Sequence, residues 1–170
     1  MSDFVRAPLT AEADLAKFDC GTAALNTWLT GQALRAQAAG VGRTHLWSPR
    51  GNPTQVAAYF TLAATQVDRT AVPRRATGGY TTIPSFLLGR LALDCSLQGQ
   101  GWGTAVLLDA LRVIIQASEL IGGRLVLVGA IDEAAYTFYL RHEFHPATQS
   151  GRLFMKLDVA HALVGEADGA

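Results

Sequence analysis

A glycine-rich turn between an apolar run and a helical pattern constrains this chain more than any other feature. Residues Leu87–Leu93 form an apolar run that is short enough for a buried strand. Gln98–Gly103 then places three glycines in six positions, and apolar residues recur at helical spacing from Thr104 onward. This order predicts a strand, a turn and a helix. The free N–H groups and the dipole at such a helix N-terminus favour an anion.

A second buried strand is expected at Arg124–Ala130, which with the first strand and the helix predicts a βαβ unit of parallel strands. Before this unit we expect an edge strand at Phe4–Ala7, a helix at Ala11–Ala16 capped by Thr10, and a helix at Ala23–Ala38 capped by Thr22 and ended by Gly40. A hairpin of Thr44–Ser48 with Gln55–Gln66 and an irregular segment at Val67–Ser85 should follow. After the unit we expect a helix at Glu133–Arg141 capped by Asp132, and a hairpin of Phe144–Ala147 with Arg152–Leu157.

The length of 170 residues predicts one domain over residues 1–160 with a short, frayed tail at 161–170. No apolar run reaches the length of a membrane span, and the first ten residues lack the apolar core of a signal peptide. We therefore expect a cytoplasmic protein that does not enter a membrane. Cys20 and Cys95 match no metal or redox spacing, and we expect both to be buried as small apolar groups.

Positive charge is concentrated in the first half of the chain although the net charge is zero. Between Cys20 and Gly89 the only acid is Asp68, whereas six arginines lie in that segment. The zero net charge argues against extensive non-specific binding of polyanions. The segment itself can still face an anionic substrate.

The glycine spacing separates three classes of phosphate-binding turn. A P-loop needs a lysine after its last glycine, and this turn has none. The dinucleotide motif needs GxGxxG after the first strand, whereas these glycines are spaced differently and lie past mid-chain. The remaining pattern, Gln/Arg-x-x-Gly-x-Gly/Ala, is met by Gln98-Gly99-Gln100-Gly101-Trp102-Gly103, and it resembles the pyrophosphate loop of the GNAT superfamily of acyl-CoA-dependent N-acyltransferases.

Further residues support this resemblance and narrow it. The stretch from Ala134 to Phe144 is similar to a second GNAT signature, although Glu143 stands where glycine is usual. Upstream, Phe18-Asp19-Cys20-Gly21, Leu25-Asn26, Trp28-Leu29, Arg43-Thr44 and Leu88–Asp94 resemble one branch, the GNAT-type toxins of toxin–antitoxin operons. The resemblance implies acetylation of the α-amino group of aminoacyl-tRNA, which blocks translation. It also implies a ribbon-helix-helix antitoxin as partner and a homodimer.

The resemblance implies an α/β GNAT fold: a mixed, mostly antiparallel sheet with flanking helices, in which the parallel strands Leu87–Leu93 and Arg124–Ala130 splay to admit acetyl-CoA. It implies that a backbone N–H near Leu93 stabilises the oxyanion, and that main-chain groups of the same strand pair with the pantetheine. The expected acetyl-CoA-binding residues are Leu91, Ala92, Leu93, Gln98, Gly99, Gln100, Gly101, Trp102, Gly103, Thr104 and Phe138.

Tyr139 is the expected general acid, because a phenol is protonated at neutral pH and can protonate the leaving thiolate. Helical spacing places it on one face with Ala135 and His142, and directs Phe138 toward the core. Tyr136, one turn earlier on a neighbouring face, is the main rival. No general base stands out; Glu133 and His142 are the candidates.

Arg90, Arg43 and Arg35 are expected to contact phosphates of the substrate, and no histidine spacing indicates a metal site. Two other functions stay open. One is acetylation of a small amine or a protein N-terminus, and the other is a catalytically silent regulator that binds acyl-CoA.

Overall fold

The computed structural model describes residues 3–170, and its strands form one sheet in an α/β fold. The strands are β1 (Phe4–Pro8), β2 (Arg43–Pro49), β3 (Ala58–Asp68), β4 (Thr82–Leu93), β5 (Leu125–Gly129), β6 (His145–Pro146) and β7 (Arg152–Lys156). The α-helices are α1 (Ala23–Gly31), α2 (Ala33–Ala38), α3 (Trp102–Ser118), α4 (Glu133–Arg141) and α5 (Leu157–Gly169). Three short 3₁₀ turns are η1 (Arg69–Ala71), η2 (Arg74–Ala76) and η3 (Cys95–Leu97).

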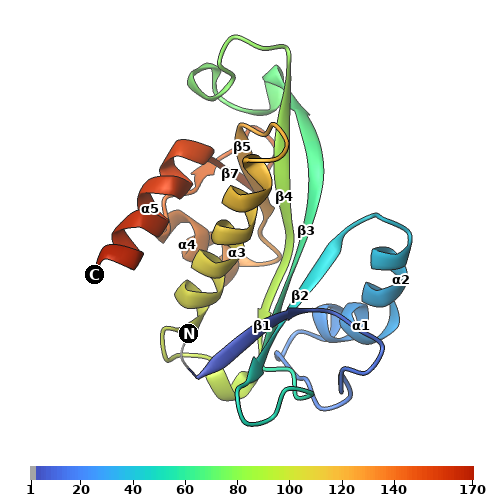
Figure 1. Ribbon diagram of the computed structural model, residues 1–170. Helices are drawn as coiled ribbons and strands as arrows, with labels where there is room; N and C mark the ends of the chain where they lie inside the picture. Colours follow the sequence, from blue (N-terminus) through green and yellow to red (C-terminus); the bar gives the residue numbers. More distant parts are fainter. Residues whose placement is uncertain (1–2) are drawn as a thin grey trace. The chain divides into compact units, whose positions relative to one another are not determined.

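The strand order is β1-β2-β3-β4-β5-β7-β6, and β3 and β4, the longest strands, lie side by side (Figure 1). β4 and β5 are parallel, as the βαβ pattern predicts, whereas β1–β2, β2–β3, β5–β7 and β6–β7 are antiparallel. The mixed, mostly antiparallel sheet expected from the sequence is therefore confirmed. The flanking helices are also present.

The chain divides into two units, and β3 and β4 contribute residues to both. The first unit comprises the chain up to Ala63 together with Arg90–Leu107, and the second comprises Ala64–Gly89 with Leu108–Ala170. The first unit has a core of Leu9, Phe18, Cys20, Leu29, Ala33, Leu46, Val56, Tyr59 and Ala92. The second unit has a core of Val72, Ala76, Ile83, Leu125, Leu127 and Phe154.

Several expected elements differ from the structure. The helix expected at Ala11–Ala16 is absent, because the backbone of this short segment bonds to another part of the chain. The Asp14 N–H donates to Thr54 O at 3.0 Å. The helix expected at Ala23–Ala38 is interrupted at Gln32, whose φ of −131° is not helical. Thr22 precedes α1 without a side-chain capping bond.

Three expectations about exposed or irregular segments were also wrong. The irregular segment is shorter than Val67–Ser85, because β3 continues to Asp68 and β4 begins at Thr82. The tail is helical, since α5 continues to Gly169 and Asp168 forms an ion pair with Arg112 of α3. Cys20 is buried as expected, but Cys95 is exposed.

Helices α2 and α4 end in the same way, although only one of them uses glycine. After α2, Gly40 has φ +74°, and the Val41 N–H donates to Ala36 O. After α4, Glu143 holds the same left-handed conformation at φ +69°, and the Phe144 N–H donates to Tyr139 O. Glu143 therefore replaces the usual glycine of the GNAT pattern at a position whose backbone conformation still favours glycine.

Replacing Glu143 by glycine is expected to raise the free energy of unfolding by about 1 kcal/mol, because the left-handed conformation costs a non-glycine residue about that much. Urea denaturation measures the change. Gly40→Ala is the matched control at the end of α2, and it is expected to lower the same quantity. A Glu143→Gly protein no more stable than wild type would show that the carboxylate compensates for the strain.

Candidate active site

The glycine-rich turn follows β4 and is built into the first unit by its side chains. Asp94 ends the strand, and its carboxylate accepts from the Ser96 N–H at 3.0 Å and from the Asp19 N–H at 3.0 Å. Burial opposes ionisation of Asp94, but these hydrogen bonds hold its pKa below the usual value. The strand end, η3 and the segment around Asp19 are therefore tied together by one carboxylate.

Gln98 fastens the turn from inside. Its side-chain amide donates to Cys20 O at 2.8 Å and to Leu93 O at 2.9 Å. The Gln100 amide likewise turns back and donates to Ser96 O at 2.8 Å. Both glutamine amides are therefore engaged by the protein, which leaves the backbone of the turn to meet a ligand.

The outer side of the turn is open where its glycines lie. Gly99 and Gly101 have φ of +74° and +84°, and a Cβ built on either would meet no protein atom within 4 Å. Immediately afterwards α3 begins at Trp102, so the N–H groups of its first turn have no acceptor within the helix. Open space beside backbone donors at a helix N-terminus fits the phosphates of a nucleotide cofactor.

An aromatic cluster holds the start of α3 in place. The Trp102 ring meets Phe4 edge-on at 5.0 Å and lies 6.3 Å from Trp47, measured between ring centroids. Phe4 in turn stacks on Trp47, which is fully buried in β2. The half-buried side chain of Trp102 is thereby used for packing, and its backbone lies at the turn.

The register between β4 and β5 ends well before β4 does. Parallel pairing runs from Ser85 with Leu125 to Leu88 with Val128, while β4 continues to Leu93. Within this last stretch Ala92 and Leu93 are buried, and Leu93 O is the acceptor for Gln98. The end of the strand is thus rigidly held, as a strand that presents main-chain groups to a ligand must be.

Arg90 lies on an aromatic platform in the first unit. Its guanidinium carbon is 3.9 Å from the ring centroid of Trp28, and Trp28 stacks on the buried Tyr59. Within residues 3–170 no acidic side chain pairs with Arg90, and burial lowers the pKa of its guanidinium. The ion pair that a strand-end arginine often makes is therefore replaced by a cation–π contact, which leaves the N–H edges available to an anion.

Asp19 and Asn26 support the glycine-rich turn, a role that sequence reasoning did not assign. The Asp19 carboxylate accepts from the Gly21 N–H and from the Asn26 amide, both at 2.9 Å, and the Gly21 bond lowers the Asp19 pKa. Asn26 also accepts from the Cys20 N–H at 2.9 Å. Because Cys20 O binds Gln98, this network reaches the turn. The sequence indicated this role only through the seven-residue spacing between Asp19 and Asn26.

In the second unit α4 carries the two candidate tyrosines. The Asp132 side chain caps the helix by accepting from the Ala135 N–H at 2.8 Å, as expected. Tyr139 is the buried one, at 6% exposure, whereas Phe138 is only half-buried; the expected orientation of Phe138 toward the core was therefore wrong. Burial raises the pKa of Tyr139 to about 12, which keeps the phenol protonated at neutral pH.

The C-terminus of α4 clamps Tyr139. Phe144 donates its N–H to Tyr139 O, and the two rings meet edge-on at 5.3 Å. The Phe138 ring also meets the Tyr139 ring edge-on, at 5.3 Å between centroids. Within residues 3–170 the hydroxyl of Tyr139 has no hydrogen-bond partner, which leaves its proton available for transfer.

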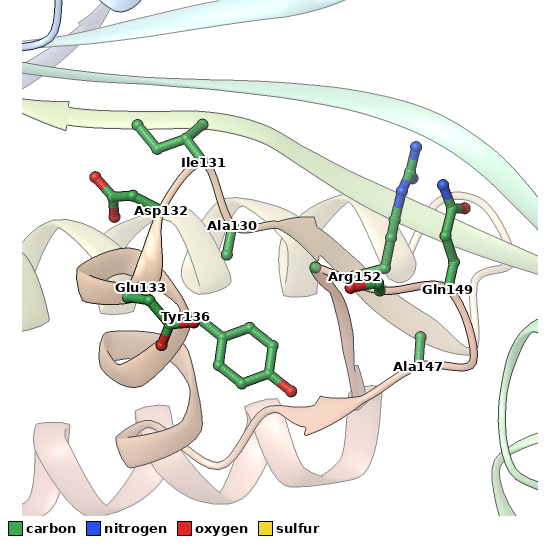
Figure 2. A pocket seen from close by; sticks show the side chains of 10 residues that line it. Ala130, Ile131, Asp132, Glu133, Tyr136, Ala147, Gln149 and Arg152 are labelled. Carbon is green, nitrogen blue, oxygen red and sulfur yellow. The ribbon is translucent and has the colours of Figure 1, made fainter.

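Tyr136 lines a cavity of about 440 Å³ between the β5–α4 turn and the β6–β7 loop. Figure 2 shows its ring extending from α4 toward Ala147, while Arg152 and Gln149 point away from it. Asp132 and Glu133 line the helix side of the cavity. Tyr136 is thus the more accessible phenol, and Tyr139 is the one whose acidity is set by burial.

No profile of a known protein family matches the chain. A curated relative does: the tRNA-acetylating toxin of Mycobacterium tuberculosis (strain ATCC 25618 / H37Rv) is 31% identical over 155 residues, which cover 90% of this chain and 92% of the relative. The chain belongs to the GNAT-type toxins of toxin–antitoxin systems.

Two solved structures of such toxins resemble this one over nearly their whole length. AtaT complexed with acetyl-methionyl-tRNAfMet is 35% identical, with a TM-score of 0.86 over 95% of this chain and 99% of that chain. A tyrosine-to-phenylalanine mutant of AtaT, bound to the C-terminus of the antitoxin AtaR and acetyl-CoA, is 35% identical with a TM-score of 0.81 over 95% and 98%.

In this GNAT-type toxin the expected site residues fall into both units. The first unit contains the glycine-rich turn, the end of β4, Arg90, and the exposed Arg35 and Arg43. The second unit contains Phe138 and Tyr139. Among the described residues no cluster of three metal-ligating side chains occurs, and no helix is long and apolar enough to cross a bilayer.

Proposed function

We propose that this chain transfers the acetyl group of acetyl-CoA to the α-amino group of an aminoacyl-tRNA and so blocks translation. The observation that carries the proposal is the full-length likeness to AtaT complexed with acetyl-methionyl-tRNAfMet, combined with an open, braced glycine-rich turn. Once acetylated, the α-amino group can no longer act as the nucleophile that forms a peptide bond.

We infer the following roles within that reaction. Backbone donors of Gln98–Thr104 hold the pyrophosphate, and main-chain groups of Leu91, Ala92 and Leu93 pair with the pantetheine. The amine attacks the thioester carbonyl, and the Leu93 N–H stabilises the resulting oxyanion. The C–S bond then breaks, and the thiolate takes a proton from Tyr139 while the new amide loses one to solvent.

Arg90 is assigned to a phosphate at the acceptor end of the tRNA, because its guanidinium is desolvated, unpaired by any described acid and held flat on Trp28. Arg43 and Arg35 are assigned weaker contacts from the exposed ends of β2 and α2. Phe138, half-buried beside Tyr139, is assigned to the cofactor.

The partners follow from the family. We infer that a ribbon-helix-helix antitoxin binds this chain, that the active form is a homodimer, and that the protein acts in the cytoplasm, where charged tRNA is found. Cys20 and Cys95 are both free thiols, in keeping with a reducing compartment.

Radiolabelled acetyl-CoA incubated with pooled aminoacyl-tRNA tests the activity. We expect label in the tRNA fraction, recovered as N-acetyl amino acid after alkaline hydrolysis, and none with deacylated tRNA. Polyamines and peptides with free N-termini, added as competing acceptors, test the alternative that the protein acetylates a small amine or a protein N-terminus. Absence of label from every aminoacyl-tRNA would overturn the proposal, and binding of acetyl-CoA without any transfer would favour a silent regulator.

A further inference from the structure

Two free thiols of the first unit lie beside the glycine-rich turn, and acetyl transfer uses neither of them. Cys95 is exposed in η3, directly after β4, whereas Cys20 is buried in the core of the first unit. Their spacing in the sequence matches no redox motif. The fold nevertheless brings the two residues together.

Backbone hydrogen bonds set the separation of the two cysteines. The Cys95 N–H donates to Asp19 O at 2.8 Å, and Asp19 directly precedes Cys20. The Asp19 N–H donates to the Asp94 carboxylate at 3.0 Å, so the two segments are held at two points. Standard backbone dimensions then limit the Cα atoms of Cys20 and Cys95 to a separation of about 7 Å or less. Disulfides join Cα atoms about 4.4–6.8 Å apart, and these two backbones are therefore within the reach of such a bond.

The Cys95 side chain faces the segment that carries Cys20. A Cβ built on Gly21, the residue after Cys20, would lie 3.4 Å from Cys95 Sγ. Cys20 Sγ instead donates to Thr22 O at 3.6 Å. Rotation of the Cys20 side chain is therefore the change that brings the two sulfur atoms into contact.

The two thiols differ in accessibility, which fixes the order in which they react. Cys95 is exposed and meets an oxidant in solution first. Burial raises the pKa of the Cys20 thiol above its usual value, so Cys20 stays protonated and reacts slowly with the same oxidant. An accessible thiol next to a second thiol that resolves it is the arrangement of redox-sensing cysteines.

We propose that Cys95 and Cys20 form a disulfide when the protein meets hydrogen peroxide, and that this bond weakens the binding of acetyl-CoA. The Cys95 thiolate attacks one peroxide oxygen, the O–O bond breaks, and the leaving hydroxide is protonated to water. The Cys20 thiol then loses its proton and attacks the Cys95 sulfur, and the S–O bond breaks to release a second water. Two thiols are oxidised to one disulfide, and one peroxide is reduced to two water molecules.

The disulfide acts on the glycine-rich turn through Gln98. The Gln98 amide donates to Cys20 O at 2.8 Å, and the Cys20 N–H donates to the Asn26 side chain at 2.9 Å. Turning Cys20 out of the core and tying it to η3 shifts this carbonyl, because a disulfide imposes its own dihedral angle. The turn then loses a hydrogen bond that braces it from inside. The effect on acetyl-CoA binding rests on the proposed function, whereas formation of the disulfide does not.

Peptide mapping of the full chain tests the bond. Reduced protein is treated with hydrogen peroxide, its remaining thiols are alkylated, and it is digested with trypsin without reductant. Cys20 and Cys95 fall in different tryptic peptides, 18–35 and 91–112. We expect these two peptides to be linked, with the loss of two hydrogen atoms, and to separate after dithiothreitol. A sulfinic acid at Cys95 beside an alkylated Cys20, or a disulfide between two copies of the chain, would overturn the proposal.

Calorimetry on oxidised and reduced protein measures the consequence. For wild type we expect the Kd of acetyl-CoA to rise about tenfold on oxidation, as when about one hydrogen bond to the pyrophosphate is lost, and to recover with dithiothreitol. Cys95→Ser is the matched control, because it removes only the exposed thiol, and its affinity should not respond to peroxide. Equal affinities of oxidised and reduced wild type would contradict the proposal. Reduced protein that binds no acetyl-CoA would instead refute the proposed function.

Discussion

Replacing Tyr139 by phenylalanine is expected to cut turnover by about 10²-fold or more while acetyl-CoA affinity stays unchanged. The change removes one oxygen atom from a buried side chain whose hydroxyl has no hydrogen-bond partner among residues 3–170. The ring remains clamped by Phe144 and Phe138, so the fold should not change. Steady-state acetyl transfer gives kcat, and calorimetry gives the affinity.

Tyr136→Phe is the control, because it removes the same atom from the neighbouring phenol, which lines the cavity beside α4. If Tyr136→Phe loses turnover and Tyr139→Phe does not, the acid is Tyr136. The pH profile adds a second readout. Burial raises the pKa of Tyr139 from 10 to about 12, so its acid form is complete below about pH 10 and is lost only as pH rises through about 12. An alkaline loss of wild-type activity near pH 8 would therefore report another group.

Replacing Gly101 by valine is expected to reduce acetyl-CoA affinity by more than about a hundredfold. The new side chain would project into the open space beside the turn, where the pyrophosphate is placed, and φ of +84° would strain a β-branched residue. Losing two hydrogen bonds to a charged group, at about 1.5–3 kcal/mol each, accounts for this magnitude. Gly103, in the first turn of α3, is expected to respond in the same direction.

Gly40→Val is the matched control for backbone strain. Gly40 lies in the same unit, has φ +74° and also faces open space, but it ends α2 away from the turn. Both variants should lose thermal stability, and only Gly101→Val should lose acetyl-CoA binding by calorimetry. Unchanged affinity in Gly101→Val would show that the cofactor does not lie against this turn.

Local chemistry explains which elements could be predicted. The strand, glycine-rich turn and helix around residues 87–118 were recognisable because apolar period and glycine spacing act over a few residues. Asp132 and Gly40 were correctly assigned to helix ends for the same reason. The helix expected after Thr10 failed because its backbone partner, Thr54, lies far along the chain. The prediction of a frayed tail was wrong because α5 is anchored by the burial of Ala160 in its first turn and by the ion pair between Arg112 and Asp168 near its end.

The candidate site shows the same division. The open turn could be predicted from the spacing of Gly99 and Gly101, because that pattern involves no residue elsewhere in the chain. The inward role of Gln98 depends on Cys20, 78 residues away, and the position of Arg90 depends on Trp28 in another element. The burial that sets the acidity of Tyr139 depends on how α4 packs and how its C-terminus returns through Phe144.

Sequence alone was sufficient for the family and the fold class, and it supplied the predictions of an anion-binding turn and of Tyr139 as the acid, because these are carried by short patterns whose spacing is itself the signal. Tertiary structure alone decided which side chains brace the turn and which phenol is buried. Those features arise from contacts between residues far apart in the chain, and such contacts form only when the sheet has aligned its strands.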